Sequence, residues 1–73
     1  MTWHYQAVHY APDGHDCYDV REVYVGIEGG DDVSWTADAI DPFGNTKEEL
    51  IECLEMMLAD VRKWPVLELG EQA

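Results

Sequence analysis

Alternating apolar and polar positions dominate the first half of the chain, the pattern typical of β-strands. The residues from Thr2 to Tyr10 contain no glycine or proline and are rich in aromatic side chains, which predicts a strand buried on at least one face. Cys17 to Ile27 carries apolar residues on both sides and predicts a second strand. Val33, Trp35 and Ala37 recur with period two and predict a third.

Two turn signals separate these segments. Pro12-Asp13-Gly14 lies between the first two, and Gly29-Gly30-Asp31-Asp32 lies between the second and the third. Glycine takes the positive φ angles that tight turns need. We therefore predict an antiparallel meander of three strands.

The second half of the chain has the period of an amphipathic helix. Thr46-Lys47-Glu48-Glu49 matches a capping box at its start, and Pro65 ends it. Apolar residues then recur at alternating spacings of four and three and form a stripe along one side of the helix. The stripe consists of Leu50, Leu54, Met57, Val61 and Trp64, and Ile51 and Leu58 widen it. We expect this stripe to pack on the sheet. Val66 to Leu69 is an optional short edge strand.

These elements predict an α+β fold, in which a small antiparallel three-stranded sheet packs on one C-terminal amphipathic helix. A fourth short strand is optional in this prediction. A chain of 73 residues has room for one hydrophobic core, so residues 1–73 are expected to form a single domain. Because so small a core gains from added apolar surface, both a monomer and a homodimer are compatible with the sequence.

The net charge is extreme for this length. The chain contains sixteen Asp and Glu residues but only four Lys and Arg residues, which gives a formal net charge of −12. The segment from Asp13 to Asp60 holds 14 acids and two bases, so it carries the whole excess. Such a surface repels nucleic acid and anionic membranes and attracts basic surfaces. The expected partner is therefore a basic protein surface, with no direct nucleic acid and no membrane.

The sequence favours a cytoplasmic protein. No apolar run approaches the roughly 18 residues of a membrane span, and the N-terminus lacks the basic-then-apolar order of a secretory signal. We interpret Cys17 and Cys53 as reduced packing residues, with a disulfide between them as the alternative.

Catalytic and metal-binding patterns are weak. His9, His15 and Cys17, with Asp13 or Asp16, contain metal-ligating residue types but lack the paired spacing of a zinc site. The acidic glycine-bearing turns do not match an EF-hand. His15 and Cys17 would suit a base and a nucleophile, but a domain of this size leaves little room for an enclosed pocket. We expect no enzyme activity, no cofactor and no metal.

The acidic surface is the strongest functional candidate. Solubility needs a net charge of only about 2 to 8 in a small domain, and rows of carboxylates can compete for Lys and Arg clusters that hold phosphates. A plain solubilising role is the alternative. We predict that acidic residues on the turns, on the second strand and on the helix contact the partner. These residues are Asp13, Asp16, Asp19, Asp31, Asp32, Glu48, Glu52 and Glu55.

The chain shows two family resemblances, of which the first covers roughly its second half. Trp35-Thr36, Pro42, Gly44, Thr46, Glu49-Leu50, Leu54, Met57-Leu58, Lys63 and Pro65-Val66-Leu67 resemble a group of short uncharacterised bacterial proteins, which implies a fold but no function. The strands followed by the segment Gly44 to Leu50 are similar to HicB-like antitoxin domains. That resemblance implies an RNA-cleaving toxin as partner.

The small size, the α+β plan and the acidity together resemble phage-encoded anti-CRISPR proteins that mimic DNA. This resemblance implies an inhibitor of a type I surveillance complex, bound to a DNA-binding Cas subunit in the cytoplasm of the host cell. We expect this function first, with the antitoxin-like function as the alternative.

Overall fold

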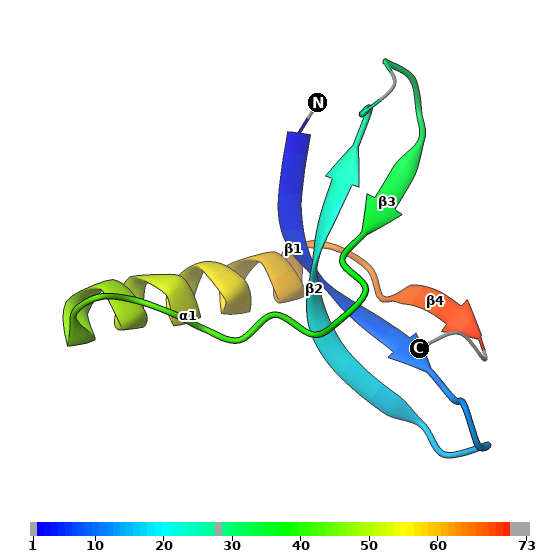
Figure 1. Cartoon of the computed structure of the whole chain (residues 1–73), viewed down its shortest axis with the longest axis horizontal. Helices are drawn as coiled ribbons and strands as arrows, with labels where there is room; N and C mark the ends of the chain where they lie inside the picture. Colours follow the sequence, from blue (N-terminus) through cyan, green and yellow to red (C-terminus); the bar gives the residue numbers. More distant parts are fainter. Residues whose placement is uncertain (1, 28, 71–73) are drawn as a thin grey trace.

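The fold is α+β, as the sequence predicts. The computed structural model describes residues 2–27 and 29–70. Along the chain it contains β1 (Thr2–Tyr10), β2 (Cys17–Val25), β3 (Val33–Trp35), α1 (Lys47–Lys63) and β4 (Leu67–Gly70), arranged as Figure 1 shows. The optional fourth strand is present, so the sheet has four strands.

The sheet is mixed, with the order β3-β2-β1-β4. β1 and β2 pair antiparallel along their full length, from Thr2 opposite Val25 to Tyr10 opposite Cys17. β3 adds three antiparallel pairs to β2. β4 runs parallel to β1, because α1 carries the chain back across the sheet before β4 begins, as a parallel connection requires.

Glycines set the two turns. Gly14 has a φ of 81° and donates its N–H to the Ala11 carbonyl at 3.3 Å. Gly26 has a φ of 76° and donates its N–H to the Asp32 carbonyl at 3.0 Å. The predicted second strand therefore ends at Val25 rather than at Ile27, because the positive φ of Gly26 breaks the extended backbone.

The third strand ends at Trp35, earlier than the predicted Ala37. The Arg21 guanidinium donates hydrogen bonds to the carbonyls of Thr36 at 3.1 Å and Ala37 at 2.8 Å. Because these carbonyls are bound by a side chain, regular strand pairing ends here, although the Thr36 N–H still donates to the Glu22 carbonyl of β2 at 3.1 Å.

The start and end of α1 follow the sequence signals. The Thr46 hydroxyl accepts the Glu49 N–H at 3.1 Å, and the Glu49 carboxylate accepts the Asn45 N–H at 3.0 Å. At the other end Trp64 donates its N–H to the Asp60 carbonyl at 2.9 Å, and Pro65 follows. A side chain at Gly44 would place its Cβ 2.4 Å from the Leu50 nitrogen, so this close approach requires glycine.

The core is small and lies mainly in the sheet. Its buried apolar residues are Tyr5, Val8, Val23, Met57 and Leu69. The register places Val8 and Val23 on one face and Tyr5 on the other.

The predicted packing of the helix stripe is met only in part, since Met57 is the one residue of α1 that is buried. Figure 1 shows α1 projecting away from the sheet, and Ile51, Leu54 and Leu58 on this helix stay exposed. The radius of gyration is accordingly 13.2 Å, against about 11 Å for a compact chain of this length.

Candidate functional site

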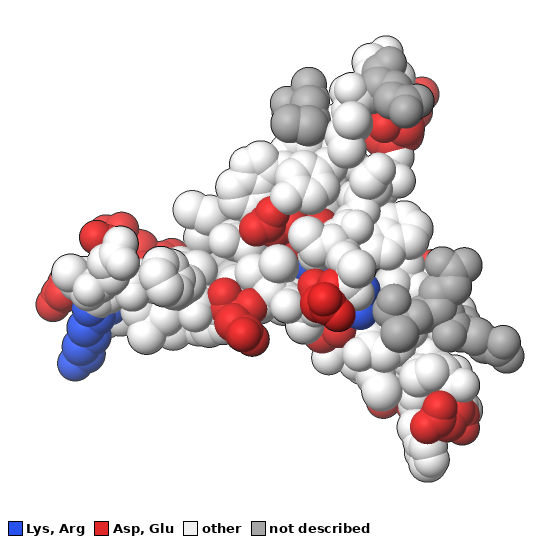
Figure 2. Space-filling model, in the orientation of Figure 1, with Lys and Arg blue, Asp and Glu red and all other residues white. Residues whose placement is uncertain are grey.

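The predicted contact acids lie in separate parts of the molecule. Asp13 and Asp16 belong to the β1–β2 turn, and Asp31 and Asp32 belong to the β2–β3 connection. Glu48, Glu52 and Glu55 lie on the first half of α1. In the view of Figure 2, Asp and Glu side chains lie at the projecting ends of the molecule and near its centre. The structure therefore presents several acidic sites rather than one continuous patch.

Asp19 differs from the other predicted acids because it forms an internal ion pair. Its two carboxylate oxygens accept hydrogen bonds from Arg21 at 2.9 and 3.1 Å. The side chains are only 16% and 2% exposed. The Arg21 guanidinium also lies 5.4 Å from the centre of the Tyr10 ring, and a hydrogen bond to Asp19 raises the pKa of Tyr10. Asp19 thus serves the fold, a role that the alternation along β2 could not reveal.

This pair also changes the balance of exposed charge. Arg21 is buried, so Lys47, Arg62 and Lys63 are the exposed cations. Because Asp19 and Arg21 compensate each other inside the fold, the Lys and Arg residues at the surface lie only at the two ends of α1.

Asp16 is joined to a histidine that the sequence had suggested only as a metal ligand. His9 Nε2 lies 2.8 Å from Asp16 Oδ1, and His9 Nδ1 lies 2.6 Å from Glu68 Oε2. Hydrogen bonds to Asp16 and then to Glu68 raise the pKa of His9. The arrangement ties β1 to β4 and to the β1–β2 turn.

The other candidate ligands do not join this histidine in a metal site. Cys17 donates its thiol to the His15 carbonyl oxygen at 3.7 Å, not to the His15 ring. Within residues 2–27 and 29–70, no group of three or more His, Cys, Asp or Glu side chains is placed to hold a metal ion. Cys17 and Cys53 are both free thiols, so the alternative of a disulfide between them is not realised.

Five predicted acids remain available to a partner. All five side chains are exposed, and in the described part of the chain they form no internal hydrogen bond or ion pair. The five are Asp13, Asp31, Glu48, Glu52 and Glu55. Together they occupy both turns of the sheet and one side of the helix. These carboxylates are the candidate interaction surface.

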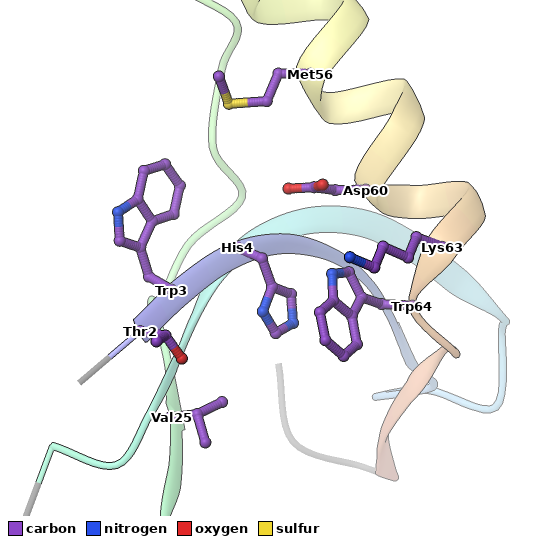
Figure 3. Close-up of a pocket in the computed structure, with 8 residues that line it drawn as sticks. All are labelled: Thr2, Trp3, His4, Val25, Met56, Asp60, Lys63 and Trp64. Atoms are coloured by element: carbon purple, nitrogen blue, oxygen red, sulfur yellow. The ribbon is translucent and has the colours of Figure 1, made fainter.

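A groove with a volume of ≈ 600 Å³ lies where the end of α1 meets the start of β1. Figure 3 shows its lining residues, which are Thr2, Trp3, His4, Val25, Met56, Asp60, Lys63 and Trp64. The His4 and Trp64 rings stack with centres 3.9 Å apart, and Asp60 accepts the Tyr5 N–H at 3.0 Å.

These contacts hold the helix to β1, so the groove is primarily the joint between helix and sheet. Sequence reasoning missed it, although the aromatic residues at Trp3-His4 and Trp64 were a visible signal.

The described helix is too short and too polar to cross a membrane. Comparison of the chain with protein-family models, with curated proteins and with solved structures finds no match. A functional assignment therefore rests on the surface chemistry.

Proposed function

We propose that this protein is a non-enzymatic binding protein whose exposed carboxylates occupy a basic, nucleic-acid-binding surface of a partner protein. The observation that supports this function most directly is the set of five acids without internal partners in the described chain. Carboxylates that hold no part of the fold together are free to meet external cations. The net charge of −12 also exceeds the value of about 2 to 8 that solubility needs.

The shape of the molecule is compatible with mimicry of a duplex. Its principal extents are 36 × 34 × 20 Å, and acidic side chains lie at its projecting ends as well as near its centre (Figure 2). One turn of B-DNA is about 34 Å long. A basic surface that holds phosphates over one turn would therefore meet carboxylates over a comparable span.

The narrower proposal concerns the partner. We favour a DNA-binding Cas subunit of a type I surveillance complex, which would make the protein an anti-CRISPR inhibitor that acts as a DNA mimic. A small RNA-cleaving toxin is the alternative, favoured by the order of antiparallel strands, capped helix and closing strand. Both partners carry a basic surface that normally binds nucleic acid.

The test is competition with DNA. The purified protein should displace target DNA from a type I surveillance complex in an electrophoretic mobility assay, and raising NaCl from about 50 to 300 mM should weaken its binding by about tenfold or more. The double variant Asp31→Asn/Glu52→Gln should lose about tenfold in affinity. The matched control Asp38→Asn/Asp41→Asn removes the same charge from exposed acids of the β3–α1 connection and should lose much less.

Two results would contradict the mimicry. One is binding that survives high salt but is abolished by Tyr18→Ala, a change to an exposed aromatic residue. The other is an equal loss in both double variants, which would mean that only the net charge matters. Inhibition of a toxin's RNA cleavage without displacement of DNA from the Cas complex would instead select the antitoxin-like function.

A further inference from the structure

A strip of exposed apolar residues runs along α1. Ile51, Leu54 and Leu58 are 43%, 46% and 50% exposed, and their spacing of three and four residues places them on one side of the helix. The side that meets the sheet is different, since it carries the buried Met57 together with Asp60 and its bond to β1. Within the described residues, the strip is an apolar surface left largely open to solvent.

The charges beside this strip have a definite order. Glu48, Glu55 and Arg62 are each seven residues apart, about two helical turns, so they lie in line along one flank of the strip. All three are exposed. The flank is thus acidic at its start and basic at its end, which makes it complementary to a second copy that runs in the opposite direction.

We propose that α1 is a self-association surface on which two copies pair as antiparallel helices about a two-fold axis. The strip formed by Ile51, Leu54 and Leu58 packs on itself, as in the apolar seam of a coiled coil. In this arrangement the same flanks face each other, and Arg62 of one copy lies opposite Glu48 of the other. The two-fold axis repeats this ion pair.

A second copy explains the observations better than an unrelated basic partner. A basic partner would need an acidic flank throughout, whereas this flank carries both signs. The small core and the large radius of gyration are features of a chain that gains stability from added apolar burial. The repulsion between two copies of net charge −12 opposes pairing, so the apolar strip must supply the attraction.

The proposed pairing predicts a specific effect of Glu55 on the dimer. This residue lies near the middle of the strip, so it faces its own copy close to the two-fold axis, where like charges oppose each other. Neutralising Glu55 should therefore tighten the pair. Asp13 and Asp31 lie on the turns of the sheet, and Glu52 lies next to this flank but further from the strip, so three of the five candidate acids stay available for the proposed partner when α1 pairs.

The experiment is sedimentation equilibrium on the full chain. Wild type should be dimeric at about 100 μM, and Arg62→Glu should weaken the dimer by about tenfold. Lys63→Glu is the matched control, because it changes the net charge equally on a part of the helix that faces away from the strip. The double variant Arg62→Glu/Glu48→Arg should restore the dimer, and Glu55→Gln should strengthen it.

A second pair of variants tests the apolar strip. Leu54→Asp should abolish the dimer, whereas Met56→Asp changes a residue that is 52% exposed on the opposite side of α1 and should keep it. Circular dichroism shows whether each variant is folded. A monomeric wild type at about 1 mM, an equal effect of the variants at Arg62 and Lys63, or failure of the double variant to restore the dimer would each overturn the proposal.

Discussion

The sheet and the helix bury their apolar side chains to very different extents. Val8 and Val23 are 0% and 1% exposed in the sheet, whereas Leu54 and Leu58 are 46% and 50% exposed on α1. Both regions have an apolar pattern in the sequence that predicts burial. The difference shows that amphipathic periodicity predicts which side of an element is apolar, but not what covers that side.

The difference also assigns separate roles to the two regions. β1 and β2 pair over nine residues each, and β2 itself carries the enclosed Arg21–Asp19 pair. α1 is held by fewer anchors, among them the Asp60 bond to the Tyr5 N–H and the stacking of Trp64 on His4. We infer that the sheet supplies most of the stability and that the helix supplies surface for binding.

The largest expected effect comes from removing the buried cation of the sheet. Arg21→Met should lower the free energy of unfolding by about 3 to 5 kcal/mol, because it leaves Asp19 as an uncompensated, largely buried charge. Urea unfolding followed by circular dichroism measures this loss. Lys47→Met is the control, since it removes an exposed cation and should change stability by less than about 0.5 kcal/mol. Equal effects would show that the sheet does not hold the stability.

A smaller effect separates the two apolar regions directly. Val23→Ala should cost about 2 kcal/mol, from two buried methylene equivalents and the cavity that they leave. Leu58→Ala should cost less than about 1 kcal/mol in dilute solution, because half of its side chain is already exposed. Urea unfolding at low protein concentration gives both values. A larger loss at Leu58 would mean that α1 is packed in the monomer.

The smallest effect concerns the pH dependence of the link between β1 and β4. Asp16 and Glu68 raise the pKa of His9 in the folded state above its unfolded value of about 6.5. The protonated ring therefore stabilises the fold fully below about pH 6.5, and this contribution is lost as the pH rises through the raised pKa. Melting temperatures between about pH 5 and 8 should show the stability of wild type relative to His9→Gln falling with pH.

The neighbouring His15 provides the control for that measurement. It is exposed, and its ring has no ion pair in the described part of the chain. His15→Gln should keep the pH profile of wild type. A flat difference between wild type and His9→Gln would contradict the stabilising role of the two carboxylates.

The positions of most elements were predictable because local chemistry decides them. The strand from Thr2 to Tyr10, the cap at Thr46 and the stop before Pro65 all depend on neighbouring residues, and they occur as predicted. The strand ends at Val25 and Trp35 were predicted two residues too late. The first depends on the φ of Gly26, and the second on carbonyls bound by Arg21.

The candidate site was predictable as a class of residue but not as a set. The sequence identifies an acidic surface, yet it cannot tell that Asp19 is enclosed with Arg21 or that Asp16 is bound to His9. Each of these contacts depends on how the strands pair and turn. Free carboxylates and engaged carboxylates therefore look alike along the chain.

By itself the sequence determined the α+β class, the element order and the strong negative charge, because propensity, turn chemistry and composition act locally or as a sum. Only the tertiary structure decided that β4 pairs parallel to β1, which acids hold the fold, and that the apolar strip of α1 stays open. These features depend on contacts between residues far apart in the chain. Such contacts are set by packing geometry, which no local pattern encodes.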